Sequence, residues 1–415
     1  MVGDVLTYLK SRGVVEAQTH PELDEISAKK KLTLYVGFDP TADSLHVGTL
    51  SVIVNLRRFQ RFGHKVIAVI GGGTAMLGDP SGRDAERLLR TKEEIDRDSE
   101  SVKSEIGRLL DPDKTIFVNN YDWLSQLKLI DFLRDVGKLF NLKHMISRES
   151  VKGRLERSEG ISYTEFTYQI FQAYDFYHLF KHHGCDLQMG GSDQWGNITA
   201  GSGLIHALEG KTAYGLTTKL IERSDGKKFA QSDAGGSIWL SRKKTDVHQF
   251  YQFWFRTSDA DFIRNLMIYT DLTGQELDPI IKEFQADPSA HTPRDRFAFE
   301  MTKLVHGEDE ALGAQASAQI IRTGSITDEN VKYAPQTLIA KENIENGLGA
   351  MQAFKTAGLV ASGKQFKARV SGGAAKINGK AVESAASQIS INDFDEKGRC
   401  LLFFGKKQFN VLVLK

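Results

Sequence analysis

The stretch "LTLYVGFDPTADSLHVGTLSVIVNLRRFQRFGHKVIAVIGGG", residues 32–73, alternates two kinds of pattern. An apolar run comes first, a segment with apolar residues at helical spacing follows, and a second apolar run ends in glycines. Strand, helix and strand at this spacing predict a βαβ unit with parallel strands. The runs "TIFVNN" and "CDLQMGGSDQWGN" extend the alternation to about residue 221. The first half of the chain is therefore predicted to be an α/β domain with a doubly wound parallel sheet.

The rest of the chain changes pattern twice. Between about residues 245 and 323, segments such as "DADFIRNLMIYT" carry apolar residues at three-and-four spacing, which predicts a helical domain. Residues 325–346 mix charges with little periodicity and suit a linker with one helix. Beyond them, "AKINGKAV" predicts a hairpin because Asn-Gly is flanked by alternating residues, and "RCLLFFGKKQFNVLVLK" predicts two more strands.

One helical pattern lies between the predicted sheet segments. The sequence "DWLSQLKLIDFLRDVGKLF", residues 122–140, predicts a strongly amphipathic helix. Two interpretations fit it equally well: an insertion that packs against another subunit, or a helix that covers its own sheet.

Composition excludes several classes of protein. The 415 residues are enough for two or three domains, and no stretch approaches eighteen uncharged apolar residues, so a membrane protein is not expected. The N-terminus lacks the apolar centre of a secretory signal, which makes a soluble, cytoplasmic protein the expectation. The two cysteines, Cys185 and Cys400, are far apart and predict neither a disulfide framework nor a metal site.

The net charge of +1 hides an uneven distribution. Residues 351–415 hold 11 Lys and Arg against 4 Asp and Glu, whereas the preceding 350 residues hold 43 against 49. A basic C-terminal domain therefore follows a mildly acidic body. Such a domain is either an electrostatic contact surface for nucleic acid or a small basic domain without an RNA partner.

Polar residues gather where the predicted strands end. Ligands bind at the carboxyl edge of an open parallel sheet, where helix N-termini also present unpaired amides. In "YVGFDPTADSLHVGTL", residues 35–50, Asp39 ends the strand, Thr41 caps the turn, and His46 begins the next helix with Gly48 leaving space beside it. A lone histidine at such a position is more often a satisfied surface residue, so later motifs decide its role.

Three further segments carry the same kind of signal. "GGGTAMLGDPSGRDAER", residues 71–87, places Asp79, Arg83 and Arg87 after a glycine run. The helical pattern of residues 164–180 puts Tyr168, Gln172 and Asp175 on one face, which for an isolated helix would be the solvated side. "LQMGGSDQWGNITAG" brings five polar or glycine residues to another strand-to-helix turn: Gln188, Gly190, Gly191, Asp193 and Gln194.

Together these motifs resemble class I aminoacyl-tRNA synthetases, and most closely the bacterial-type tyrosyl enzymes. The resemblance covers nearly the whole chain and is densest between Tyr35 and Ser232. It implies a Rossmann-like catalytic domain that forms tyrosyl adenylate from L-tyrosine and ATP with Mg²⁺ and then charges tRNA(Tyr). It implies no resident metal site. It also implies a homodimer and, more loosely, an S4-like RNA-binding domain at the C-terminus.

The resemblance also implies residue roles. Tyr35 and Asp175 would bind the phenol, and Asp79, Tyr168 and Gln172 the ammonium group, with Gln188 and Gln194 completing the tyrosine site. The nucleotide would contact Gly37, Asp39, Gly48, Gly191 and Asp193. The phosphates would meet Thr41, His46, Thr49, Arg83, Arg87, Lys228 and Gln231. Contacts with tRNA phosphates would come from Lys364, Lys367, Arg369, Lys406 and Lys407.

The sequence departs from the family pattern at three of these positions. Thr49 replaces a second histidine, and Arg83 replaces a lysine. The most serious departure is in "KFAQS", residues 228–232, where Lys228 is retained but neutral Gln231 takes the place of a second lysine. A neutral amide forfeits the charge-assisted part of a phosphate contact, so we expect slower activation, partly offset by Lys227.

Two alternatives to a tyrosyl enzyme are considered. The first is a synthetase-derived RNA-binding or regulatory protein whose catalysis is weakened by Gln231, and it stays open. A synthetase for another aromatic amino acid is disfavoured by Tyr35 and Asp175. The expected domains are a catalytic domain with a dimerisation insertion near 120–160 (1–222), a KMSKS-type loop that contains "KFAQS" with a helical anticodon-binding domain (223–324), a linker (325–346) and the S4-like domain (347–415).

Overall fold

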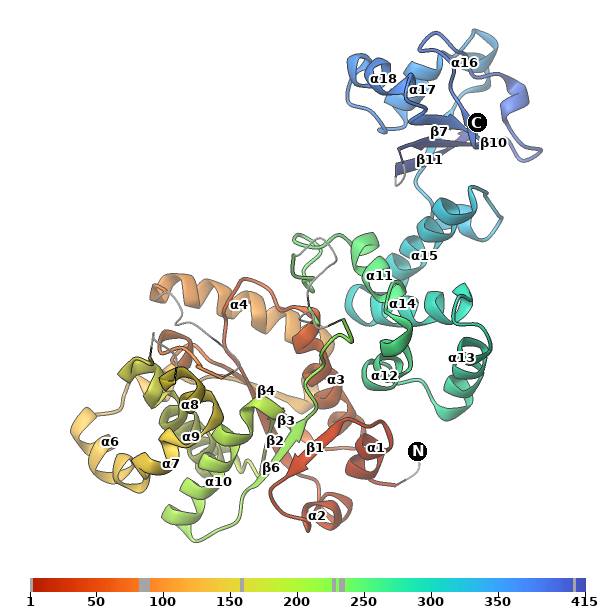
Figure 1. The fold of residues 1–415 in the computed structure, drawn as a ribbon. Helices are drawn as coiled ribbons and strands as arrows, with labels where there is room; N and C mark the ends of the chain where they lie inside the picture. The colour runs from red at the N-terminus through yellow and green to blue at the C-terminus, as the bar shows by residue number, and fades with distance from the viewer. Residues whose placement is uncertain (1–2, 82–89, 157–159, 226–228, 231–235, 406–407) are drawn as a thin grey trace. The chain divides into compact units, whose positions relative to one another are not determined.

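The computed structural model describes residues 3–81, 90–156, 160–225, 229–230, 236–405 and 408–415 (Figure 1). The chain divides into two compact units. The first combines Met1–Thr245 with Ser258–Ile281, and the second combines Asp246–Thr257 with Lys282–Lys415. Within the described ranges, no helix is long and apolar enough to cross a membrane.

The first unit is built on a six-stranded sheet with the order β1-β6-β5-β2-β3-β4. Four neighbouring pairs are parallel, and only β1 runs antiparallel, against β6. This confirms the predicted doubly wound parallel sheet, to which the structure adds an antiparallel edge strand. The strands are β1 Val15–Gln18, β2 Thr33–Phe38, β3 Lys65–Ile70, β4 Thr115–Asn119, β5 Leu187–Gly191 and β6 Tyr214–Thr218.

Helices cover both faces of this sheet. Tyr35, Ile67 and Val69 point to one face, where they pack in one buried cluster with Phe176 and Leu179 of α9. Because side chains alternate along a strand, neighbours such as Leu34 and Val66 are left for the opposite face. The helices of this unit are α1 Val5–Ser11, α2 Leu23–Lys29, α3 Val47–Arg61, α4 Lys92–Leu109, α5 Tyr121–Leu124, α6 Leu129–Asp135, α7 Leu142–Ile146, α8 Glu149–Leu155, α9 Tyr163–His183, α10 Trp195–Glu209 and α12 Asp259–Tyr269.

The single helix predicted over residues 122–140 is wrong. The segment forms α5, α6 and a 3₁₀ turn at Gly137–Leu139. Lys128, before α6, has extended backbone angles (φ −82°, ψ 122°), which cannot continue a helix. Phe132 and Val136 are buried against α9 and α10, whereas Leu129 and Ile130 on the other side are 69% and 74% exposed.

The second unit contains a helical part and a C-terminal sheet. Its helices are α11 Val247–Phe255, α14 His291–His306, α15 Glu308–Thr323, α16 Lys341–Glu345, α17 Ala350–Thr356 and α18 Gly363–Val370, while α13 Gly274–Ala286 runs across the division of the chain. The sheet has the order β7-β11-β10-β8-β9. Its strands are β7 Gln336–Ile339, β8 Ala375–Ile377, β9 Lys380–Ala381, β10 Arg399–Phe404 and β11 Gln408–Leu414.

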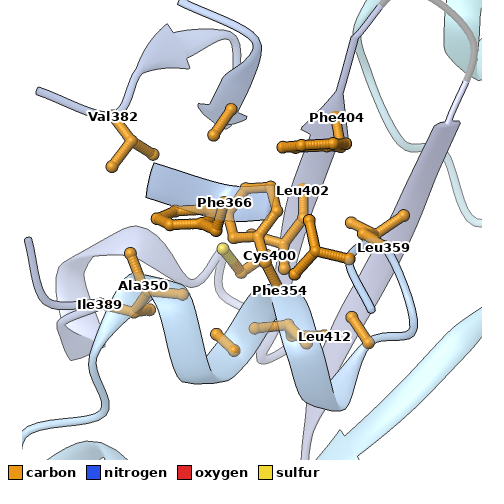
Figure 2. Packing of buried hydrophobic residues seen from close by; sticks show 14 of the residues in the cluster. Ala350, Phe354, Leu359, Phe366, Val382, Ile389, Cys400, Leu402, Phe404 and Leu412 are labelled. Carbon is orange, nitrogen blue, oxygen red and sulfur yellow. The ribbon is translucent and has the colours of Figure 1, made fainter. Parts of the chain in front are cut away.

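The C-terminal sheet is buried on both faces. Alternate residues of β10, among them Cys400, Leu402 and Phe404, pack against the helices that carry Phe354 and Phe366 (Figure 2). Leu401 and Phe403, which alternate with them along β10, pack with Val411 against Ile320 of α15. Both predicted hairpins are confirmed, and the Asn-Gly turn has the positive φ angles that such a turn requires, 48° at Asn378 and 82° at Gly379.

The segment predicted as a linker is part of this domain's packing. β7 pairs in parallel with β11, and Ile344 of α16 joins the buried cluster. A four-residue edge strand is too short to leave a periodic signal in the sequence, which explains why the pattern did not reveal it. The boundaries at residues 222, 324 and 346 stay predictions.

Candidate active site

A cavity of about 660 Å³ opens at the carboxyl edge of β2, β5 and β6. Its lining contains every described residue that was predicted for the tyrosine, nucleotide and phosphate sites: Tyr35, Gly37, Asp39, Thr41, His46, Gly48, Thr49, Asp79, Tyr168, Gln172, Asp175, Gln188, Gly191, Asp193 and Gln194. Residues from four separate segments of the chain thus meet around one space. The other predicted residues of the site lie outside the described ranges: Arg83, Arg87, Lys228 and Gln231.

The first wall of the cavity is the turn from β2 into α3. His46 is the N-cap of α3, and its Nδ1 accepts a hydrogen bond from the Gly48 amide at 3.1 Å. Burial lowers the pKa of His46, so the ring is neutral at physiological pH and carries its proton on Nε2. The ring therefore presents a donor beside the unpaired amides of a helix N-terminus, where an anion is stabilised.

The absence of a side chain at Gly48 makes room for the His46 ring. A Cβ atom at residue 48 would lie 2.9 Å from Cε1 of His46, closer than packed atoms approach. The space beside the helix start is thus filled by the imidazole, whereas the sequence interpretation assigned it to a ligand.

The chain around the "KFAQS" segment, residues 228–232, is fixed to this wall on both sides of residues 231–235. Val47 donates its amide to the carbonyl of Ile238 at 3.0 Å, and the Ile238 amide bonds to the Ala230 carbonyl at 2.8 Å. Lys244 lies over the Trp239 ring, 4.4 Å from its centroid, and pairs with Asp43. Ala230 and Ile238 are therefore both held beside this wall of the cavity.

The deepest part of the cavity contains Asp175. Its carboxylate accepts hydrogen bonds from Asn120 Nδ2 at 2.9 Å and from Trp123 Nε1 at 2.8 Å. Burial raises the Asp175 pKa to about 7, against the lowering effect of these two bonds. The carboxylate is oriented by its donors but remains costly to charge.

Tyr35 complements this carboxylate. Its side chain is 1% exposed, and its hydroxyl has no hydrogen-bond partner among the described residues. Burial, and then the charge of Asp175, raise the pKa of Tyr35, so the hydroxyl keeps its proton. An unpaired buried hydroxyl carries a desolvation cost that a ligand hydroxyl would remove. The pair offers one donor and one acceptor to such a group.

A network of amides and carboxylates lies next to this pair. Gln194 donates to Asp79 at 2.9 Å and accepts from Gln172 at 3.2 Å. The Tyr168 hydroxyl donates to Asp39 at 3.0 Å. The network thus combines amide and carboxylate oxygens in the lining of one cavity, and such acceptors are what an ammonium group with three donors requires. Buried Oε1 atoms of Gln172 and Gln188 have no partner among the described residues.

Asp39 lies elsewhere in the network than its predicted nucleotide role suggests. Besides Tyr168, it accepts a bond from Thr74 Oγ1 at 2.7 Å. A Cβ at Gly71 would lie 1.9 Å from Asp39 Oδ1, and one at Gly72 would lie 2.4 Å from Asn119 Oδ1. The glycine run after β3 therefore makes room for these side chains.

The other end of the cavity is formed by the turn after β5. Asp193 lies in a short 3₁₀ turn at Ser192–Gln194, and burial, then the charge of Asp79, raise its pKa. A Cβ at Gly191 would meet Asp193 Oδ1 at 2.6 Å, so a glycine is needed for the carboxylate to lie here. Lys219, directly after β6, adds an exposed cation to the lining.

Sequence reasoning missed several residues of the site. Asn120, Trp123 and Thr74 hold the carboxylates, and Trp239 packs near His46 at a ring-centroid distance of 6.3 Å. Asn120 did have a signal, because it is the last residue of the predicted strand run "TIFVNN". Trp123 and Trp239 had none, since their contacts join distant segments.

Comparison with known proteins agrees with this geometry. Residues 27–321 match the family model of "tRNA synthetases class I (W and Y)". "Tyrosine--tRNA ligase 2" of Enterococcus faecalis is 42% identical over 413 residues, covering 97% of this chain and 98% of the relative. "Tyrosine--tRNA ligase" of Bacillus caldotenax is 39% identical and covers 99% of both chains.

Solved structures agree as well. A C-terminally truncated mitochondrial tyrosyl-tRNA synthetase of Aspergillus nidulans superposes with a TM-score of 0.70 at 29% identity, over 76% of this chain and 93% of that one. A tryptophanyl-tRNA synthetase of Encephalitozoon cuniculi shares the fold at 16% identity and a TM-score of 0.55. The chain belongs to the class I aminoacyl-tRNA synthetases, in the bacterial-type tyrosyl-tRNA synthetase family.

Proposed function

We propose that the protein activates L-tyrosine with ATP and transfers the tyrosyl group to tRNA(Tyr). The observation that carries this is the buried pair at the cavity's deep end, the unpaired hydroxyl of Tyr35 and the oriented carboxylate of Asp175. A phenol hydroxyl satisfies both, because it accepts from one and donates to the other. Phenylalanine would leave both unsatisfied, a form of discrimination for which tyrosyl-tRNA synthetases are themselves the established example.

The first step needs no general base. The carboxylate of tyrosine is already an anion, and one of its oxygens attacks the α-phosphorus of ATP while the bond to the β-phosphate oxygen breaks. Pyrophosphate leaves and tyrosyl adenylate forms. Positioning and stabilisation of the phosphate charge supply the catalysis. The Nε2–H of His46 and the hydroxyls of Thr41 and Thr49 are the described donors in place for this task.

The second step transfers the tyrosyl group to RNA. A hydroxyl of the terminal ribose of tRNA attacks the carbonyl carbon of the adenylate, the bond to the AMP oxygen breaks, and the hydroxyl proton is released as AMP leaves. Mg²⁺ enters with ATP, because this ion is usually held by substrate phosphates and few protein ligands. Within the part of the chain that the structure describes, no three His, Cys, Asp or Glu side chains gather as a metal cage.

The same site supports the other assigned roles. Asp79, Tyr168 and Gln172 bind the tyrosine ammonium group, together with Asp39, which shares a hydrogen bond with Tyr168. Gln194 lies by the carboxyl group. Asp193 binds the ATP ribose, since a carboxylate at this edge of a doubly wound sheet suits a ribose hydroxyl. The phosphate site is completed by three cations, Arg83, Arg87 and Lys228. The neutral Gln231 also belongs to it.

The C-terminal domain is proposed to contact tRNA. Lys364, Lys367 and Arg369 are all exposed on α18, and α18 belongs to the basic C-terminal region. Phosphate contacts of this kind position a nucleic acid without reading its sequence. Replacing all three with alanine should weaken tRNA charging, most strongly at low salt, and make it less dependent on salt, while tyrosine-dependent pyrophosphate exchange stays unchanged. Loss of both activities would contradict this division of labour. Lys406 and Lys407 belong to the same proposal but lie outside the described residues.

A homodimer is proposed from the insertion. The insertion exposes several large apolar side chains, and exposed apolar surface of this kind marks interaction sites. The exposed residues are Leu129, Ile130, Leu133, Leu139, Leu142, Ile146 and Leu155, and exposed Tyr163 follows at the start of α9. Sedimentation of the wild-type protein and of Ile130→Lys should give a dimer and a monomer, respectively.

We place this activity in the cytoplasm, where the tRNA pool is charged for translation. The alternative, an RNA-binding or regulatory protein with weakened catalysis, finds no support among the relatives, which are named tyrosine–tRNA ligases. Aminoacylation assays with tyrosine, tryptophan and phenylalanine test the proposal. Charging with tyrosine alone is the expected result, and inactivity with all three would overturn it.

A further inference from the structure

The polar face of α9 extends beyond the tyrosine site. His178 follows Asp175 by three residues and His182 follows it by seven, so both lie on the same side of the helix as Asp175. The His178 ring stacks on the Trp123 indole, with ring centroids 4.4 Å apart and planes 11° from parallel. The His182 ring also contacts His178, at a centroid distance of 4.4 Å and a tilt of 39°.

Trp123 joins this histidine to the site. The same indole donates its N–H to Asp175 Oδ1 at 2.8 Å. An indole has a single donor, so its ring orientation decides whether that bond forms. Trp123 lies on α5, a helix of only four residues, and is partly buried. Such a short helix fixes a side chain weakly, and contacts with neighbouring elements must supply the rest.

We propose that His178 is a positioning residue for tyrosine recognition. It supports the face of Trp123, and Trp123 in turn holds the carboxylate of Asp175 in the orientation that accepts the phenol proton. The inference rests on the proposed function, because only that function makes the phenol hydroxyl of tyrosine the ligand of Asp175. His178 touches no substrate itself and acts through the indole.

The surroundings of the two titratable residues favour this role. Burial, and then the neighbouring His182 and His183, lower the pKa of His178 to about 4, so a neutral ring faces the indole at physiological pH. The groups that face Asp175 are the donors Asn120 and Trp123, the carboxylate of Asp39 and the hydroxyls of three tyrosines, Tyr35, Tyr168 and Tyr174. A weakened Trp123 bond removes one interaction that lowers the Asp175 pKa, so that pKa rises.

The test measures tyrosine-dependent pyrophosphate exchange as a function of pH. His178→Ala should raise the KM for tyrosine about tenfold, the size expected when a hydrogen bond to a charged group is weakened, and leave kcat and the KM for ATP within about twofold. The acidic limb of kcat/KM for tyrosine should move to higher pH. His178→Phe keeps a ring on the indole and should restore the wild-type KM and pH profile.

Two further variants complete the test. His182→Ala is the matched control, since His182 touches His178 and not Trp123. It should leave both readouts unchanged. Trp123→Phe keeps the ring and removes the N–H, so it should reproduce the effect of His178→Ala, which keeps the proposal testable if the alanine variant does not fold.

Three results would overturn the inference. They are an unchanged KM for tyrosine in His178→Ala, equal losses in His178→Ala and His178→Phe, and wild-type behaviour of Trp123→Phe. Each requires a wild-type protein that is active with tyrosine. A wild-type protein inactive with tyrosine contradicts the proposed function instead, so the two failures are distinguishable.

Discussion

The two ends of the cavity are built differently. At the tyrosine end, Asp175 is buried and held by two side-chain donors before any ligand arrives. At the phosphate end, the described donors are a half-buried histidine at a helix N-terminus and two threonines, exposed Thr41 and half-buried Thr49. The cations expected there, Arg83, Arg87 and Lys228, lie outside the described residues. One end is thus organised for selection and the other for the passage of a highly charged nucleotide.

The difference follows from the chemistry of each end. A hydroxyl is distinguished from a hydrogen only where unpaired polar groups are buried, because there an unmade hydrogen bond carries its full cost. A triphosphate needs charge and backbone amides, which also work in contact with water. We therefore expect changes at the tyrosine end to alter selectivity, and changes at the phosphate end to alter rate.

The largest effect is expected at the tyrosine end. Asp175→Asn preserves shape but replaces an acceptor-only carboxylate with an amide that also donates. It should lower kcat/KM for tyrosine about 100- to 1,000-fold, because a hydrogen bond to a charged group is lost and a mismatched donor faces the phenol. Pyrophosphate exchange measures this. A loss below about fivefold in a folded variant would contradict the assigned role.

A smaller effect is expected from the histidine at the phosphate end. His46→Ala removes a donor aimed at developing phosphate charge and should lower kcat about 10- to 100-fold. The KM for tyrosine should stay within about twofold, because His46 lies on a different wall from Asp175. Steady-state exchange kinetics with varied tyrosine separate the two constants. An equal change in both would show that the ends are not independent.

The sequence predicted much of this arrangement for identifiable reasons. The parallel strands have clear apolar runs, and residues at the carboxyl ends of parallel strands must meet at one edge of the sheet. Contacts between distant segments could not be predicted in the same way. The stack of His178 on Trp123 joins residues 55 positions apart along the chain, and no local pattern encodes it. The helix predicted over 122–140 failed because amphipathic spacing does not reveal the extended residue Lys128.

The next effect concerns pH. Burial raises the Asp175 pKa to about 7, so the carboxylate form that accepts the phenol proton is lost as pH falls below that value. The value of kcat/KM for tyrosine should therefore fall about tenfold per pH unit below about pH 7. The same raised pKa contributes stability at low pH, which is lost as pH rises towards 7. Asp175→Asn should abolish this fall in kcat/KM at acidic pH. If the fall persists in the variant, it is caused by another titrating group.

The smallest effect is expected from Gln231. Gln231→Lys restores a charge-assisted phosphate contact, which is roughly twice as strong as a neutral one, and should speed pyrophosphate exchange several-fold. Lys227→Ala in the wild-type background should slow it if that lysine partly compensates. The KM for tyrosine should not change in either variant. If the lysine variant is no faster, the missing cation has no bearing on activation in this protein.

The central claim is that Tyr35 and Asp175 select tyrosine through its hydroxyl. The most direct measurement is the ratio of kcat/KM for tyrosine to that for phenylalanine, in the wild-type protein and in Tyr35→Phe. The variant removes a buried hydroxyl that has no partner among the described residues, so its unfolding free energy should stay equal or rise by about 1 kcal/mol. We predict that the ratio falls about tenfold or more, because kcat/KM for tyrosine falls while kcat/KM for phenylalanine does not. An unchanged ratio in this folded variant would contradict the account.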